Sequence, residues 1–228
     1  MRRTLSAILL FLFPAIAAAE PTQGFYVAGG LMNQQLKARL QSSEIFDSAQ
    51  VGINSSSSRY GSGGTLLAGY QFPFTSSGSV MLEVGTDRGV DSSFSASGVS
   101  APNETLDVHW KVSRNWFLAV KPGIRFGDGL TGYVSFAYHD ADAELSRTVS
   151  GTQNNTRIGV RSLGGFGIGL GLQGYLSERV FIRGEVENIR FSRNTIDLVS
   201  SGSGGTLVSL HSIQPEAIVG RMIIGYRF

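Results

Sequence analysis

The final stretch of the chain, Ala217–Phe228, reads AIVGRMIIGYRF. Its even positions carry apolar residues and one glycine: Ile218, Gly220, Met222, Ile224, Tyr226 and Phe228. Its odd positions mix valine, isoleucine and glycine with Arg221 and Arg227. Successive side chains of a strand point to opposite sides, so this period of two predicts a β-strand with one apolar face and one mixed face.

The same alternation is clearest in residues 107–126. The even positions from Val108 to Phe126 are apolar apart from Arg114, whereas the odd positions are mostly polar or charged. A helix would mix the two sets, so only a strand separates them. Pro122 lies inside this strand and cannot donate a ladder hydrogen bond, so we expect a local irregularity there.

Weaker alternation elsewhere brings the expected number of strands to eight. The expected strands cover residues 24–31, 60–72, 80–87, 107–126, 130–139, 164–175, 180–187 and 217–228. Short turns are expected at residues 73–79, 127–129 and 176–179. Long polar loops are expected at residues 41–59, 91–103, 146–156 and 194–210. Connections that alternate between long and short predict an all-β, antiparallel up-and-down barrel.

Composition and the first residues indicate where such a barrel resides. Residues 1–19 have the form of a signal peptide, with Arg2 and Arg3, an apolar run and Ala17–Ala19 before the expected cleavage site. The barrel is then residues 20–228. Without those two arginines the 19 basic residues become 17, equal to the 17 acidic ones, so the basic isoelectric point does not indicate nucleic-acid binding. Cysteine is absent, so disulfides and thiolate metal sites are excluded.

Two barrel types fit this alternation. A soluble lipocalin-type barrel would point its apolar residues inward, whereas a transmembrane barrel would point them toward lipid. The signal peptide, the terminal Phe228 and the confinement of charge to one face favour the transmembrane barrel. Trp116 and Phe126 would then be roughly 25 Å apart along the membrane normal, for a strand tilted by about 40°. We expect interface aromatics at Trp116, Phe126, Tyr226 and Phe228.

Three sequence features carry a resemblance to a known family. They are KPGIRFGDGLTGYVSFAY at residues 121–138, GGFGIGLGLQGY followed by FIRGEVE at residues 164–187, and the terminal GYRF. The chain resembles the small eight-stranded outer-membrane β-barrels of Gram-negative bacteria, which include the OmpA transmembrane domain, OmpX and the porin-like opacity-type surface proteins. The resemblance implies a cell outer-membrane location. It also implies that Arg221, Tyr226 and Phe228 form the signal read by the barrel-assembly machinery, although Ile223 replaces a glycine often found there.

The inward face of this barrel would carry many charges: Glu83, Asp87, Lys111, Lys121, Arg125, Arg161, Arg183, Glu185, Glu187, Arg221 and Arg227. They could line a narrow small-solute channel or pair with one another and fill the lumen. Eight strands leave little space, and buried charges require partners, so we favour a structural charge network. Its expected members are Glu83, Lys121, Arg125, Arg183, Glu185, Glu187 and Arg221. We expect four of them at the centre of the lumen, because their depths are similar: Glu83, Lys121, Arg183 and Glu185.

An enzyme is the competing functional class, because some small outer-membrane barrels modify lipid A. The three histidines are His109, His139 and His211, and none lies in a motif of a lipid A deacylase. We therefore expect lumen or rim histidines, no catalytic residue, no metal and no cofactor. The glycines of residues 165–171 precede no helix, so they do not form a dinucleotide site.

The sequence thus predicts a non-catalytic barrel with an envelope-structural or surface-interaction role through its long extracellular loops. Expected partners are outer-membrane lipid, lipopolysaccharide, the assembly machinery and a host or surface ligand at the loops, with no nucleic acid. The alternatives are a narrow channel and, less favoured, a lipid A-modifying enzyme.

Overall fold

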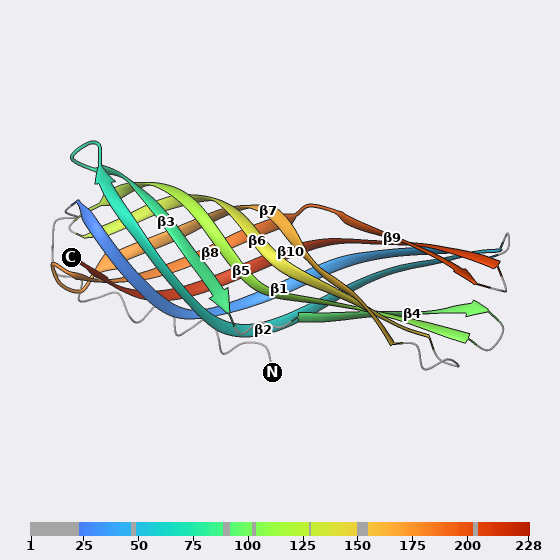
Figure 1. Cartoon of the computed structure of the whole chain (residues 1–228). Coiled ribbons are helices and arrows are strands. Elements are labelled where there is room, and N and C mark those ends of the chain that lie inside the picture. Colours follow the sequence, from blue (N-terminus) through green and yellow to red (C-terminus); the bar gives the residue numbers. More distant parts are fainter. Residues whose placement is uncertain are drawn as a thin grey trace.

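A computed structural model describes residues 23–46, 49–88, 92–101, 104–127, 129–149, 155–202 and 205–228. Eight long or medium strands form the barrel: β1 (Gly24–Phe46), β2 (Ala49–Pro73), β3 (Gly78–Arg88), β5 (Glu104–Phe126), β6 (Leu130–Val149), β7 (Asn155–Tyr175), β8 (Val180–Phe191) and β10 (Gly205–Arg227). Every neighbouring pair is antiparallel, and β1 pairs with β10. The predicted eight-stranded, closed up-and-down barrel is therefore confirmed (Figure 1). Among the described residues there is no helix that is long and apolar enough to cross a membrane.

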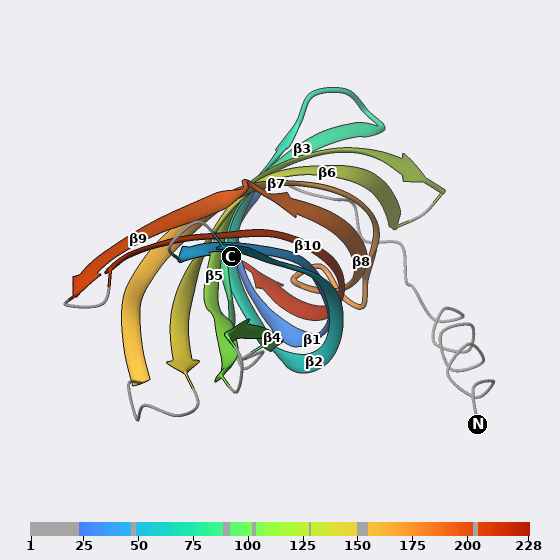
Figure 2. The same ribbon diagram turned by 90° about the vertical axis from the view of Figure 1, so that its right-hand side faces the viewer.

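Two further strands lengthen the hairpins at one end of the barrel. The strand β4 (Ser92–Ala101) pairs with β5, and β9 (Asn194–Gly202) pairs with β10. The hairpins β1–β2 and β6–β7 are also paired far beyond the barrel. All four extensions leave the same end (Figure 1) and spread in different directions (Figure 2).

The expectation of long polar loops was wrong for most of these residues. Gln41 pairs with Asn54, and Ser200 pairs with Leu207, in segments expected to be irregular. Backbone donors and acceptors in a long connection need partners, and a continued hairpin supplies them. Because these segments are rich in Ser and Gly, they carry no apolar alternation that would reveal the strands.

The opposite end of the barrel has the short turns that the sequence predicted. Leu176 donates its backbone N–H to the carbonyl of Val180 at 2.8 Å. In the turn between β5 and β6, Gly127 and Gly129 adopt φ values of 58° and 114°, which favour glycine. Pro122 interrupts the ladder between β5 and β6, where no pairs form at residues 121 and 122, whereas pairing with β3 continues. The predicted irregularity is therefore present.

The two faces of the barrel have opposite chemistry. Large apolar side chains are exposed on the outer face, for example Leu66, Ile168 and Leu170 at 65%, 62% and 67%. Charged side chains fill the interior, with Glu83 and Lys121 each 1% exposed. A lipocalin-type barrel would show the reverse, so the apolar outer face identifies a transmembrane barrel.

Candidate functional site: the charged lumen

The centre of the lumen is a four-residue ion-pair cluster. The Nζ atom of Lys121, from β5, lies 2.6 Å from Oε2 of Glu83 and 2.5 Å from Oε2 of Glu185. Arg183 forms an ion pair with the other oxygen of Glu83. Glu83 comes from β3, and both Arg183 and Glu185 come from β8, so the cluster bridges the barrel. The structure thus brings together the four residues expected at the centre.

A second cluster lies toward the extensions and is organised by Arg221 of β10. Its guanidinium is 2.7 Å from Oδ2 of Asp87, 3.0 Å from Oε1 of Glu185 and 2.5 Å from Oε2 of Glu187. Its side chain is 1% exposed. Since Glu185 contacts both Lys121 and Arg221, the two clusters form one continuous network.

A histidine completes this second cluster. In His139, Nε2 lies 3.0 Å from Oε1 of Glu187, and Nδ1 lies 3.1 Å from Nδ2 of Asn115. The ring is fully buried, in agreement with a lumen histidine. The side chains of His109 and His211 lie outside the described residues. Among the described residues, no group of three or more carboxylate or imidazole side chains is placed to hold a metal ion.

Two tyrosine side chains contact the buried charges through their hydroxyls and their rings. The hydroxyl of Tyr26 donates to Glu83 at 2.6 Å, and that of Tyr133 donates to Glu185 at 2.7 Å. The guanidinium of Arg183 lies over both rings, 5.6 Å and 5.4 Å from their centroids. Each contact stabilises a buried charge without adding another charge. The sequence did not indicate the contact of Tyr26 with Glu83 across the lumen.

Glycines of β7 make room for this network. A Cβ atom at Gly171 would lie 2.2 Å from Cζ of Tyr133, and one at Gly167 would lie 2.2 Å from Oε1 of Glu187. These glycines point inward and leave space for long side chains. The space is taken by an aromatic ring as well as by a carboxylate.

Polar groups close the lumen toward the short turns. Arg183 donates to Oε1 of Gln173 at 2.7 Å, and the hydroxyl of Tyr175 donates to Oε1 of Gln71 at 2.9 Å. Arg227 donates to the same hydroxyl at 3.2 Å.

Arg125 does not join the network, although the sequence suggested it. Its side chain is half-buried, and Nε has no hydrogen-bond partner among the described residues. Its backbone N–H donates to the carbonyl of Ser77 at 2.7 Å, which places it at the turn end of the barrel. The side chains of Lys111 and Arg161 lie outside the described residues.

Apolar side chains close the lumen toward the extensions. Met32, Leu36, Leu163, Ile189 and Val219 occupy inward positions on four strands and are at most 2% exposed. The sequence analysis did not single out these residues. The inward positions of these residues follow from the alternation of their strands, but the sequence does not show that the five side chains lie at neighbouring depths.

The predicted interface aromatics all face outward. Trp116 and Phe126 are 42% and 57% exposed, and Tyr226 and Phe228 are 39% and 74% exposed. The indole N–H of Trp116 donates to Asp140 at 3.0 Å on the extension side. At the turn end, the Tyr226 ring centroid lies 5.4 Å from that of Phe228, and the Tyr226 hydroxyl accepts a hydrogen bond from Arg179 at 3.1 Å.

No protein-family model and no curated protein sequence matches this chain. Among solved structures, it is similar to the outer membrane protein OprG from Pseudomonas aeruginosa, with 13% identity, a TM-score of 0.45 and coverage of 93% of this chain and 99% of that one. It is also similar to Ail, the attachment invasion locus protein of Yersinia pestis, at 14% identity and a TM-score of 0.41, covering 87% of this chain and 99% of that one. A third similar structure is Neisserial surface protein A, with 11% identity, a TM-score of 0.38 and coverage of 88% of this chain and 99% of that one.

Proposed function

We propose that this protein is a non-catalytic barrel of the Gram-negative outer membrane with a closed lumen. In this proposal, its four hairpin extensions form the surface that meets other molecules outside the cell. The apolar outer face and the grouping of all four extensions at one end support this orientation.

The observation that carries the proposal is the filled cross-section of the lumen. Glu83, Lys121, Arg183 and Glu185 are each at most 4% exposed, and every one has an ion-pair partner in the cluster. An open channel would leave these side chains hydrated. The apolar layer formed by Met32, Leu36, Leu163, Ile189 and Val219 supports closure at a second level.

Planar-bilayer recording tests the closed lumen against the narrow-channel alternative. Refolded wild-type protein should give no stepwise conductance, whereas a general porin prepared identically should. Regular single-channel steps from the wild type would contradict the closed lumen and favour the channel.

A surface-interaction role is tested by shortening the extensions without altering the barrel. Residues beyond the barrel in each of the four hairpins are replaced by a two-residue Asn-Gly turn. Expression of the wild type should increase bacterial adherence to cultured epithelial cells, and expression of this variant should not. Equal adherence, with equal amounts of heat-modifiable protein in the outer membrane, would argue against the role.

The enzyme alternative has a separate test. The lipid A of a host that expresses the protein should keep an unchanged mass. A mass change that requires His139 would contradict the non-catalytic assignment.

A further inference from the structure

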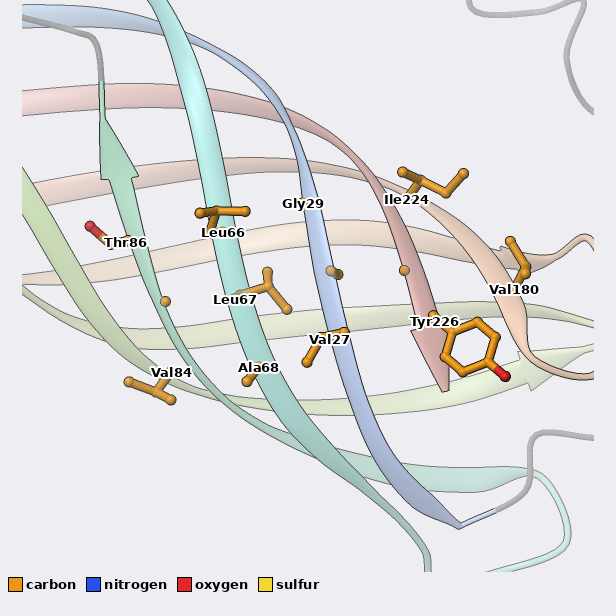
Figure 3. A pocket seen from close by; sticks show the side chains of 13 residues that line it. Val27, Gly29, Leu66, Leu67, Ala68, Val84, Thr86, Val180, Ile224 and Tyr226 are labelled. Carbon is orange, nitrogen blue, oxygen red and sulfur yellow. The ribbon is translucent and has the colours of Figure 1, made fainter. Parts of the chain in front are cut away.

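The outer face of the barrel has a hollow on the sector formed by β10, β1, β2 and β3. Its volume is about 760 Å³, and its lining includes the small residues Gly29 and Ala68. Leu66, Val84 and Ile224 form its walls (Figure 3), and all three are more than half exposed. On β7, by contrast, the outward positions carry large side chains such as Phe166 and Leu170.

The strand register gives this hollow a direction. Ile224 pairs with Gly29, Gly29 with Leu66, and Leu66 with Thr86, so one row of residues crosses four strands. Inclusion of Val180 on β8 extends the hollow over four strand spacings, or about 19 Å. Because barrel strands are tilted, the row runs obliquely through the membrane. At a strand tilt of about 40°, the row of about 19 Å covers about 12 Å along the membrane normal, slightly less than one leaflet of a hydrocarbon core about 30 Å thick.

A basic residue lies just beyond the extension-side end of the hollow. Thr86 lines that end and pairs with Trp116, one of the interface aromatics. Arg88 follows Thr86 by two residues on the same outward face and is exposed. Its guanidinium is therefore at the level where the head groups of the outer leaflet begin.

Charge is distributed unevenly around the extension side of the barrel. Among the described side chains at outward positions of β10, β1, β2 and β3, the charged ones are the basic Lys37, Arg39 and Arg88 and the acidic Glu216, which lies opposite Lys37. On β6 the corresponding residues are Asp140, Asp142 and Glu144, which are all acidic. An anionic head group is thus attracted to the same sector that contains the hollow.

We propose that the hollow binds one acyl chain of lipid A, with a lipid A phosphate paired to Arg88. The apolar chain would cover Gly29 and Ala68, and the guanidinium would supply charge-assisted hydrogen bonds to the phosphate. The site rests on the membrane orientation proposed above, in which the extensions face outward.

Two variants separate the chain site from the phosphate site. Gly29→Leu fills the hollow, and a Cβ there would meet only the flexible end of Leu66 at 3.0 Å and a backbone oxygen at 3.5 Å. Arg88→Gln removes the cation but keeps a polar side chain. The matched controls are Leu170→Phe, on the outer face of β7, and Arg190→Gln, an outward residue with a 77% exposed side chain.

The probe is purified bisphosphorylated lipid A, titrated into detergent-refolded protein and followed by native mass spectrometry. A heat-modifiable band first establishes that each variant forms the barrel, so failure of the barrel assignment is recognised separately. Gly29→Leu and Arg88→Gln should each weaken binding about tenfold or more, whereas both controls should bind like the wild type. The preference of the wild type for lipid A over phosphatidylethanolamine should vanish in Arg88→Gln.

Equal affinity of Gly29→Leu and wild type would overturn the chain site. Equal affinity of Arg88→Gln and wild type would overturn the phosphate site. Comparable losses in the two controls would show general detergent-like binding to the whole outer face, and would also overturn the proposal.

Discussion

At the scale of single residues, the lumen depends on compensation between buried charges. Arg221 contacts three carboxylates, on Asp87, Glu185 and Glu187, at 2.5–3.0 Å. Removal of one partner from such a group is costly because the remaining charges stay buried without compensation. The position of Arg221 is therefore among the most sensitive in the network.

Arg221→Met should lower the free energy of unfolding by about 3–5 kcal/mol, because three carboxylates lose their shared cation. The measurement is equilibrium unfolding in urea from lipid vesicles. Arg190→Met is the matched control, because its ion pair with Glu216 is 3.9 Å long and exposed, and should cost less than about 1 kcal/mol. Equal effects of the two substitutions would contradict a compensated lumen.

Glycine substitutions test how tightly the lumen is packed. Gly171→Ala would place Cβ 2.2 Å from Tyr133, whose hydroxyl is held by Glu185, and should destabilise the barrel by about 1–3 kcal/mol. Gly184→Ala is the control, because a Cβ there meets nothing within 4 Å. The same unfolding assay should show a neutral or slightly stabilising change for Gly184→Ala. A neutral Gly171→Ala would mean that Tyr133 moves freely.

At the scale of elements, barrel strands could be predicted from sequence, but hairpin extensions could not. The part of β5 that crosses the barrel alternates apolar and polar residues because one face meets lipid and the other meets the lumen. The extensions have no such pair of environments, so Ser and Gly can occupy either side. Strands form there because backbone N–H and C=O groups need hydrogen-bond partners. This requirement does not select particular side chains, so the sequence does not reveal these strands.

Hydrogen exchange distinguishes paired extensions from irregular loops. Backbone amides in the β1–β2 extension, where Gln41 pairs with Asn54, should exchange more slowly than the same segment in an unstructured peptide. Fragment-resolved mass spectrometry of refolded protein gives the rates. The amides of Ser76 and Ser77, in the turn between β2 and β3, serve as the internal reference for fast exchange, because the hydrogen-bonded amides of that turn are those of Phe74 and Thr75. Unprotected extension amides would contradict the pairing.

At the scale of the whole molecule, the medium around the barrel decides the effect of an outward charge. Leu170 is 67% exposed near the middle of its strand, so Leu170→Arg should destabilise the barrel by about 2–4 kcal/mol in a bilayer. Tyr60→Arg is the control, because Tyr60 is 78% exposed beyond the membrane span and should tolerate the charge. Urea unfolding from vesicles measures both. Equal tolerance would indicate that water surrounds Leu170.

The whole barrel also explains which parts of the lumen site were predictable. Alternation shows that Glu83 and Lys121 point inward, and distance from the short turns shows that their depths are similar. Partners across the lumen depend on the stagger of eight strands, so the contact of Tyr133 with Glu185 could not be predicted. Arg125 was wrongly predicted to join the charge network. It lies on the inward face, but beside a short turn, closer to that end of the barrel than the network is.

The order of the strands along the chain gives Arg221 a consequence for barrel formation. It lies on β10, the last strand, whereas its carboxylate partners lie on β3 and β8. Before β10 docks, three acidic groups face a low-dielectric interior without this guanidinium, and the edges of β1 and β8 are unpaired in lipid. Docking of one strand relieves both penalties together. An open seven-stranded intermediate is thus unfavourable on two independent grounds, so we expect insertion to be cooperative and all-or-none.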